Sequence, residues 1–456
     1  MPETTLLPAT SRALLHRIAT AQTQGRAPSM TAAVLRDGAR VWSEGYGLVD
    51  GAVPGDDTQY RIGSLTKTFV AVLVLRLREE GLIDLDDQLS RHLPDAPAGS
   101  ATIFQLLAHT SGVAAETPAP WWERTPGDLR PELGDILDDD YRKHPAGHRF
   151  HYSNPGFALL GALVERLRGQ SLEQVLQREI LTPLGMTRTS LLPQAPHALG
   201  WAVHPWADVL LPEPTEDAGR LAPAGQLWST ITDLCRFAAF LAEGHPAVLP
   251  AAAVELMRTA ASPPDGDQWE GGYGLGLQLK RDHGRILAGH TGSMPGFLAV
   301  LWFSPTERIA AVVLANTTSG ISIGGLGADL VRIVCEHEPR IPEPWQPLAE
   351  FDPALLELTG PWYWGPGGVG LKLCADGDLE LGPLVGTGRG ARLKAQPDGT
   401  WLGLDGYYAG ETLRVVRRAD GTVDHLDLGS FVFTRTPYDA GADVPGGVDP
   451  AGWRGR

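Results

Sequence analysis

The sequence contains few cysteines, with three among 456 residues, at Cys235, Cys335 and Cys374. An odd and widely spaced set is typical of proteins in a reducing compartment, and it forms neither a disulfide framework nor a paired-cysteine metal motif. None of the three has the surroundings of a catalytic thiol. We therefore interpret all three cysteines as packing residues, and we expect neither a metal site nor a cofactor in this chain.

Positive charge is also scarce, because 38 Lys and Arg residues oppose 54 Asp and Glu residues, for a net charge of −16. Without a basic stripe, nucleic acid and anionic membrane surfaces are not expected partners. No apolar run approaches the roughly 20 residues of a membrane-spanning helix. The first 30 residues lack a cationic segment followed by an apolar one, so no secretory signal is expected. Together these absences predict a cytoplasmic protein.

The pattern of apolar residues predicts a first domain over 1–337, in which strands at both ends bracket a helical middle. This arrangement suggests one mixed or antiparallel sheet, flanked by helices and built from both ends of the domain. We expect strands at 30–35, 40–48, 273–279, 285–290, 297–303 and 309–315. We expect helices at 13–24, 64–80, 158–167, 234–241 and 325–335.

A different pattern follows residue 337. Residues 338–357 are rich in Pro and Glu and are interpreted as a linker. Residues 358–437 contain short strands separated by Gly and Asp turns, which predict a small all-β sandwich or barrel. The last stretch, 438–456, is interpreted as a disordered tail.

Ser64-Leu65-Thr66-Lys67 is the motif most suggestive of chemistry. Gly63 precedes it and an apolar helical pattern follows it, so Ser64 should lie at a helix N-terminus, where unpaired N–H groups favour a developing oxyanion. Lys67 is three residues further on and therefore on the same helix face. If that face is buried, the pKa of Lys67 falls and its amine can accept the serine proton.

Two further motifs fit this pair in chain order, Tyr152-Ser153-Asn154 and His290-Thr291-Gly292-Ser293. A Ser-x-x-Lys, a Tyr-x-Asn and a basic-Thr-Gly triplet in this order resemble the penicillin-recognising serine hydrolases, and among them the class C β-lactamase and D-aminopeptidase branch. The resemblance covers about residues 10–336. It implies an α/β serine β-lactamase-like fold, with the active site between the sheet and a helical subdomain.

The resemblance also implies roles for these residues. Ser64 would form an acyl-enzyme, and Lys67 would act as the base or keep Tyr152 ionised, while Tyr152 carries the proton to the leaving group. Asn154 would orient the lysine and bind the substrate's amide. Thr291, Gly292 and Ser293 would bind substrate, with an oxyanion hole at the backbone N–H groups of Ser64 and Ser293. His109-Thr110-Ser111-Gly112 is given no catalytic role.

One residue departs from the family's pattern. His290 begins the third triplet, where the antibiotic-hydrolysing and cell-wall enzymes usually have a lysine that binds a substrate carboxylate. A largely neutral imidazole is a poor substitute for that ammonium. Hydrolysis of β-lactams is therefore not the expected main activity, although His290 remains a predicted site residue.

The serine motif, the missing export signal and the C-terminal β-domain, which resembles a lipocalin, together resemble the penicillin-binding-protein-type thioesterases. Those stand-alone enzymes take a nonribosomal peptide from a carrier protein and close it head to tail. The resemblance implies a peptidyl thioester, or a small peptide or ester, as the substrate and a peptidyl carrier protein as a partner. Two alternatives stay open. One is a hydrolase of the same fold, such as an esterase, a D-stereospecific aminopeptidase or carboxypeptidase, or a weak β-lactamase. The other is a non-catalytic binding protein.

Overall fold

The computed structural model of the chain describes residues 5–126, 132–262, 270–439 and 441–443. The chain divides into two compact units, Met1–Arg340 and Ile341–Arg456. Each unit is described by itself below.

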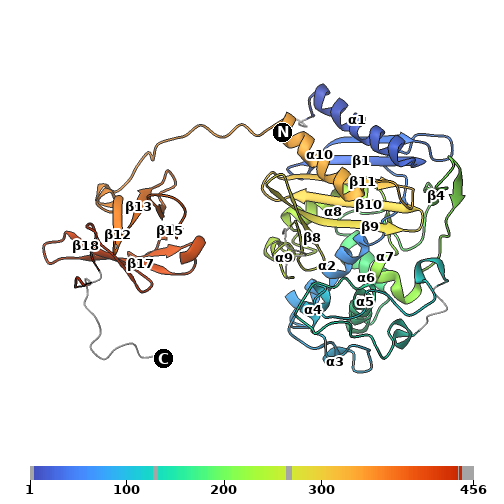
Figure 1. Cartoon of the computed structure of the whole chain (residues 1–456), viewed down its shortest axis with the longest axis horizontal. Coiled ribbons are helices and arrows are strands. Elements are labelled where there is room, and N and C mark those ends of the chain that lie inside the picture. Colours follow the sequence, from blue (N-terminus) through green and yellow to red (C-terminus); the bar gives the residue numbers. More distant parts are fainter. Residues whose placement is uncertain (1–4, 127–131, 263–269, 440, 444–456) are drawn as a thin grey trace. The chain divides into compact units, whose positions relative to one another are not determined.

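A seven-stranded sheet forms the centre of the first unit, with the strand order β2-β1-β11-β10-β9-β8-β7 (Figure 1). Every neighbouring pair is antiparallel, and β1 pairs with β11 from Met30 opposite Ala315 to Arg36 opposite Ile309. The expectation of one sheet built from both ends of the domain is therefore confirmed, in its antiparallel form. The strands are β1 (Ser29–Arg36), β2 (Ala39–Gly47), β7 (Gly271–Tyr273), β8 (Gln278–Asp282), β9 (Arg285–Met294), β10 (Phe297–Ser304) and β11 (Ile309–Ala315).

Helices cover both faces of this sheet, so its central strands are buried on both sides. Every residue of β10 and β11 is buried, as their continuous apolar sequences require. Alternate residues enter different cores: Val300 and Trp302 pack with α1 (Pro8–Gly25) and α10 (Ile323–His337), whereas Leu301 faces the helical middle. Figure 1 shows α1 and α10 together on one side of the sheet, with α2 and α8 on the other.

The helical middle contains the helices expected from the sequence around residues 64–80, 158–167 and 234–241. Its helices are α2 (Leu65–Glu79), α3 (Leu89–His92), α4 (Ile103–Leu107), α5 (Asn154–Arg168), α6 (Leu172–Leu176), α7 (Ala222–Gly225), α8 (Ile231–Glu243) and α9 (Ala251–Met257). Short helical turns are η1 (Trp122–Arg124), η3 (Leu133–Ile136), η4 (Gln177–Leu181) and η5 (Gly219–Leu221). Two small two-stranded sheets join β3 (Tyr60–Arg61) to β6 (Trp228–Ser229), and β4 (Trp201–Val203) to β5 (Leu210–Pro212).

The single strand expected at 273–279 is wrong in its middle. Tyr273 ends β7 and Gln278 begins β8, and 274–277 form the turn between them, where the N–H of Gly274 donates to the carbonyl of Leu277 at 2.8 Å. Gly276 has a φ of +71°, which a β-strand does not allow. The alternation of Gly and Leu imitates strand periodicity here, because glycine carries no side chain that would mark a face.

The second unit is an eight-stranded antiparallel sheet whose strands follow one another in chain order. Tyr363 and Thr434 exchange backbone hydrogen bonds of 2.8 and 2.9 Å, which bring the last strand back to the first and nearly close a barrel. This up-and-down order is the one that lipocalins have, and the predicted all-β domain is confirmed. The strands are β12 (Gly360–Trp364), β13 (Gly367–Leu373), β14 (Leu379–Pro383), β15 (Ala391–Ala395), β16 (Trp401–Gly403), β17 (Thr412–Arg417), β18 (Val423–Leu428) and β19 (Phe431–Phe433).

The sequence pattern missed β12 and β19, the two strands that meet at the closure. Both are short aromatic segments beside glycine, so neither shows alternation over enough residues. Before the barrel, residues 339–352 form no helix or strand, and η6 (Pro353–Glu357) occupies the end of the predicted linker. Most of the predicted tail, residues 440 and 444–456, lies outside the described residues.

Two of the three cysteines are buried, Cys235 and Cys335, whereas Cys374 is partly exposed. No helix among the residues that the structure describes is both long and apolar enough to cross a membrane.

Two glycines let the start of α2 lie directly against strand β9. A Cβ atom added at Gly292 would lie 1.9 Å from the carbonyl oxygen of Ile62, and one at Gly63 would lie 2.6 Å from the backbone nitrogen of Ser293. Gly63 also has a φ of +54°, which side chains disfavour. The backbone just before Ser64, at Ile62 and Gly63, is therefore in van der Waals contact with the backbone of β9 at Gly292 and Ser293.

We expect Gly292→Ala to lower the free energy of unfolding by about 1–3 kcal/mol, because its methyl group must push the Ile62 carbonyl away. Gly55→Ala is the matched control, since a Cβ atom there would have no neighbour within 4 Å. The midpoint of urea unfolding measures both. Equal midpoints for the two variants would contradict the close contact between β9 and the start of α2.

Candidate active site

Ser64 lies at the N-cap of α2, as the sequence predicts, and its side chain is partly buried. An N-cap serine usually accepts a hydrogen bond from the first turn of its helix. Ser64 instead has helical backbone angles, φ −63° and ψ −7°, and its side chain makes no capping hydrogen bond. The hydroxyl is therefore not engaged by the backbone N–H groups of the helix and can interact with other side chains.

Lys67 is completely buried, and its Nζ atom joins three elements of the structure. Nζ lies 3.1 Å from Ser64 Oγ, 2.6 Å from Asn154 Oδ1 on α5 and 2.6 Å from the carbonyl oxygen of Ala224 on α7. The last two atoms can only accept hydrogen bonds. A neutral amine has two N–H groups and one lone pair, so with both donors directed at these acceptors its lone pair faces the Ser64 hydroxyl.

Burial lowers the pKa of Lys67 to about 7, against the opposing effect of the negative charges of Glu116 and Glu123. A substantial share of the molecules then carries the neutral amine near neutral pH. The geometry and the protonation state together suit Lys67 to accept the Ser64 proton.

Tyr152 lies beside both residues. Its ring centroid is 4.9 Å from Lys67 Nζ, and its hydroxyl forms a hydrogen bond with Ser64. Burial raises the pKa of Tyr152, and the hydrogen bond with Ser64 only partly opposes this effect. Of the two roles left open by the sequence, a neutral Tyr152 beside a basic Lys67 therefore fits better than an ionised Tyr152.

Asn154 is the first residue of α5, and Ser153 caps that helix by accepting a hydrogen bond from the N–H of Gly156 at 3.0 Å. Besides its bond to Lys67, Asn154 donates from Nδ2 to Oε1 of Glu116 at 2.7 Å. His109, expected to be structural, supports this segment, because its Nδ1 accepts from the N–H of Ser153 at 3.0 Å. Its ring also packs 4.2 Å from that of Tyr152.

His290 lies in the same region, but its ring nitrogens are both occupied by protein atoms. Nδ1 is 2.5 Å from the carbonyl oxygen of Thr291 and Nε2 is 2.9 Å from the hydroxyl of Tyr273. Because a carbonyl oxygen only accepts, Nδ1 carries the proton and Nε2 accepts from Tyr273. Burial and, secondarily, the charge of Lys67 lower the pKa of His290 to about 3, so the ring is neutral.

The remaining predicted residues follow His290 on β9. The N–H and hydroxyl of Thr291 both donate to Gln278 Oε1, at 3.0 and 3.1 Å. Gly292 lies against Ile62, and the backbone nitrogen of Ser293 lies beside Gly63, as described above. The structure thus brings the Ser293 N–H next to the residue before Ser64, where the sequence resemblance expects the second donor of an oxyanion hole.

The sequence missed several residues that shape this site, namely Glu116, Trp122, Ala224 and Tyr273. Ala224 acts through its backbone, which no sequence pattern reveals. Glu116 and Trp122 lie in the segment after α4, where no periodicity indicates a direction. Among the described residues, no group of three or more His, Cys, Asp or Glu side chains could hold a metal ion.

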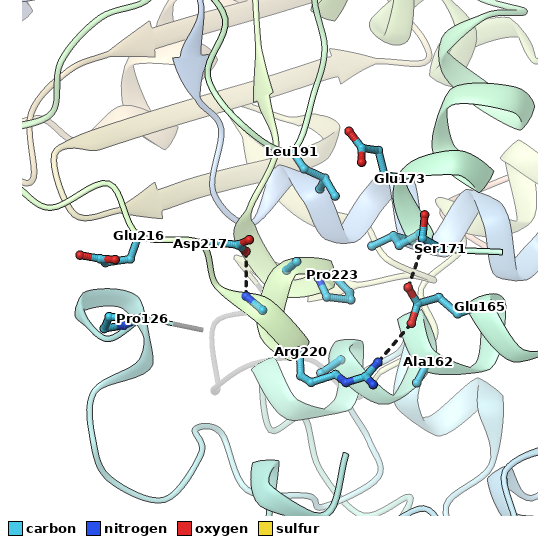
Figure 2. Close-up of a pocket in the computed structure, with 14 residues that line it drawn as sticks. Pro126, Ala162, Glu165, Ser171, Glu173, Leu191, Glu216, Asp217, Arg220 and Pro223 are labelled. Atoms are coloured by element: carbon cyan, nitrogen blue, oxygen red, sulfur yellow. Dashed lines mark hydrogen bonds and ion pairs between the residues drawn. The ribbon is translucent and has the colours of Figure 1, made fainter. Parts of the chain in front are cut away.

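A separate pocket of about 680 Å³ is lined partly by Ala222 and Pro223 of α7. Figure 2 shows this pocket, with Pro223 among its labelled residues. Two of its acidic side chains stabilise the local backbone: Glu165 accepts from the N–H of Leu172 at 2.8 Å, and Asp217 accepts from the N–H of Gly219 at 2.9 Å. Ser64 does not line this pocket. We therefore place the candidate active site at Ser64 and not in this pocket.

If Lys67 is the base, the rate at which a fluorophosphonate labels Ser64 should rise with pH through about 7, because only the neutral amine accepts a proton. Lys67→Arg should label about 10²–10⁴ times more slowly, since a guanidinium does not give up its proton. Lys143→Arg, at an exposed lysine paired with Asp140, is the control and should label at the normal rate. Labelling that does not change with pH would contradict this role of Lys67.

Comparison with known proteins agrees with this geometry. A family model described as Beta-lactamase matches residues 14–336, and a second, described as a domain of unknown function (DUF7586), matches residues 351–435. Among curated relatives, "Penicillin-binding protein 4" of Amycolatopsis lactamdurans is 29% identical over 69% of this chain and 86% of its own length. "Beta-lactamase-like protein 2" of Dictyostelium discoideum is 30% identical over 50% of this chain, and the alignment spans 45% of that relative's length.

Solved structures resemble the chain over a greater length. The crystal structure of SurE with D-Leu is 27% identical, with a TM-score of 0.58, and the match covers 94% of this chain and 100% of that one. The octameric penicillin-binding protein homologue from Pyrococcus abyssi has a TM-score of 0.63 at 22% identity, over 93% of this chain and 99% of that one. A D-stereospecific amidohydrolase from a Streptomyces species is 25% identical over 73% of this chain and 99% of its own, with a TM-score of 0.58.

The family model spans the sheet, the helical middle and all three motifs of the candidate active site. The chain belongs to the beta-lactamase family, with an α/β serine β-lactamase-like unit followed by an all-β barrel.

Proposed function

We propose that this chain is a serine acyltransferase that forms an acyl-enzyme on Ser64, and specifically a stand-alone thioesterase that releases a nonribosomal peptide and closes it head to tail. The observation that supports acyl transfer best is the contact between Ser64 Oγ and the buried Nζ of Lys67, whose other two hydrogen bonds go to pure acceptors. The cyclisation step rests on the resemblance to the penicillin-binding-protein-type thioesterases.

In the first half of the reaction Lys67 takes the proton of Ser64, and Oγ attacks the carbonyl carbon of the peptidyl thioester. The backbone N–H groups of Ser64 and Ser293 stabilise the tetrahedral oxyanion. When the carbon–sulfur bond breaks, the proton returns through Tyr152 to the departing sulfur. The peptide is then an ester of Ser64.

In the second half the N-terminal amine of the same peptide attacks the ester carbonyl. The amine loses one proton to the Lys67 and Tyr152 pair, the bond to Ser64 Oγ breaks, and the serine recovers a proton. Amide formation within one molecule gains from the high effective concentration of the amine, provided that the bound peptide is folded back on itself.

The neutral state of His290 supports a donor that lacks a free carboxylate at its reacting residue. Family members that act on penicillins or on a peptide's C-terminus usually have a lysine at this position. Here both ring nitrogens are taken by Thr291 and Tyr273. A thioester carries no such carboxylate, because the carrier's sulfur replaces it.

Similarity that extends beyond the first unit also supports this reading. The match to SurE with D-Leu covers 94% of the chain, so it includes part of the C-terminal unit. We propose by analogy that the residue esterified to Ser64 is a D-amino acid and that a peptidyl carrier protein delivers the thioester.

A hydrolase of the same fold is the second candidate. Ser64 is only partly buried and Ser293 is exposed, so water can reach the acyl-enzyme unless the peptide covers it. A hydrolase would release the linear acid, with water in place of the amine.

A synthetic peptidyl thioester with a free N-terminus and a D-residue at the thioester distinguishes the two candidates. We expect a product lighter than the linear acid by one water, which mass spectrometry identifies as the macrocycle. Ser64→Ala should give neither product above the uncatalysed level, whereas Ser319→Ala, at an exposed loop serine, should behave as the wild type. Formation of the linear acid alone would contradict the cyclase and favour the hydrolase.

Labelling of Ser64 by a fluorophosphonate addresses the remaining alternative, a binding protein without catalysis. We expect covalent labelling of the wild-type chain and none of Ser64→Ala, read by intact-protein mass spectrometry. A wild-type chain that stays unlabelled across the pH range would contradict any acyl-enzyme mechanism.

A further inference from the structure

The side chain of Asn154 lies between a basic residue, Lys67, and an acidic one, Glu116. Its Oδ1 accepts from Nζ of Lys67 at 2.6 Å, and its Nδ2 donates to Oε1 of Glu116 at 2.7 Å. The other carboxylate oxygen of Glu116 accepts from Nε1 of the buried Trp122 at 2.8 Å. A continuous chain of hydrogen bonds therefore runs from Trp122 through Glu116, Asn154 and Lys67 to Ser64.

The oxygen and nitrogen of an asparagine side chain occupy nearly the same space, so the amide can turn over by half a rotation. Its orientation depends on which neighbours donate and which accept. A carboxylate only accepts, so Glu116 holds Nδ2 on its own side and thereby turns Oδ1 toward Lys67. The indole N–H of Trp122 donates to the second carboxylate oxygen of Glu116 and so fixes the orientation of that carboxylate.

We propose that Glu116 is a positioning residue of the active site, which acts through Asn154 by keeping the amide oxygen directed at Lys67. This assignment rests on the proposed acyl transfer through Ser64. Among the described residues, Glu116 forms no hydrogen bond with Ser64 or Lys67, and it is an exposed residue of the segment after α4. Its effect on the reaction passes through the amide and through its charge.

The amide orientation decides where the lysine's lone pair points. With Oδ1 and the Ala224 carbonyl accepting its two N–H groups, a neutral Lys67 has its lone pair free for Ser64. If the amide turned over, its NH₂ group would face Nζ and would itself use that lone pair. The base would then be occupied by Asn154 and unable to accept the serine proton.

Glutamine at position 116 cannot do what the carboxylate does. Glu116 accepts from two donors, whereas a glutamine offers one acceptor oxygen and one NH₂ group. Either the indole N–H or the asparagine NH₂ would then face another donor. Turning the Asn154 amide over relieves that conflict, but it directs the NH₂ group of the amide at Lys67 in place of Oδ1.

The groups that face Lys67 also set its pKa. Nζ is surrounded by Ser64, Asn154, the Ala224 carbonyl and the rings of Tyr152 and Phe157, at 4.9 and 5.9 Å from their centroids. The charges that act on it are those of Glu116 and Glu123, both of which raise its pKa. Burial lowers the pKa of His109 and of His290, and both rings are neutral. Removing the charge of Glu116 therefore lowers the pKa of Lys67.

The test is the rate of fluorophosphonate labelling of Ser64 as a function of pH. For Glu116→Gln we expect the plateau rate to fall about 10–100-fold, a part of what a general base contributes. We also expect the acidic limb of the pH–rate profile, where the labelling rate rises with pH, to move to lower pH, because Lys67 loses its proton more readily. A residue with only a structural role would lower the rate without moving the limb.

Three further variants isolate the route through Asn154. In the Asn154→Ala background, Glu116→Gln should cause no further loss of plateau rate, since the group it acts through is gone. Glu116→Asp keeps a pure acceptor and a charge, and should recover part of the rate and the wild-type limb. Glu123→Gln removes a charge that acts on Lys67 without a bond to Asn154, so it should move the limb but keep the plateau.

The assignment would be overturned if Glu116→Gln lowered the plateau rate by the same factor in the wild-type and Asn154→Ala backgrounds. It would also be overturned if the wild-type chain labelled normally and Glu116→Gln left the acidic limb at the wild-type pH. A wild-type chain that does not label at all would instead overturn the proposed function on which the assignment rests.

Discussion

Burial of a single amine, that of Lys67, is the constraint on which the rest of the active site depends. Removing an ammonium from water is costly, so the site must supply acceptors or let the proton go. The protein does both: α5 and α7 each contribute one acceptor, and the pKa falls to about 7. The aromatic rings around Nζ exclude water without competing for its hydrogen bonds. Hydrogen bonds to a single atom, Nζ of Lys67, thereby connect α2 with α5 and α7.

A second constraint acts on the sheet side of the site. Strand β9 lies against the start of α2 through two glycines, so the backbone nitrogens near Ser64 and Ser293 hold their spacing without any side chain between them. His290 on the same strand makes no charged contact and is held by Tyr273 and the Thr291 carbonyl. A protonated Lys67 therefore supplies positive charge in this site, opposite the carboxylates of Glu116 and Glu123. A lysine at position 290, which the sequence resemblance leads us to expect in the antibiotic-hydrolysing enzymes, would add a second positive charge.

Much of this arrangement follows from the sequence, and the parts that do not have identifiable reasons. Ser64 and Lys67 share a helix, so their spacing predicts their contact, and the ordered motifs placed Tyr152, Asn154 and His290 in the same region. The long strands and helices of the first unit were also predictable from their periodicity. The Ala224 carbonyl was not, because backbone groups have no residue identity. Glu116 was missed because its partner lies 38 residues away and joins it only through the fold. At β7 and β8 the Gly and Leu alternation imitated one strand where two meet at a turn.

The contact that nearly closes the C-terminal barrel limits where an added peptide strand could pair with the edges of its sheet. Tyr363 and Thr434 use their backbone groups on each other, and Arg435 covers the seam with its guanidinium 3.8 Å above the Trp362 ring. An open sheet would present unpaired N–H and C=O groups to any extended peptide, including another copy of itself. Here Tyr363 and Thr434 satisfy these groups on each other at the bridge where the two edges meet. A peptide cannot continue the sheet at this bridge, and what the bridge presents to its surroundings is side chains, whose identity can change in evolution without disturbing the fold.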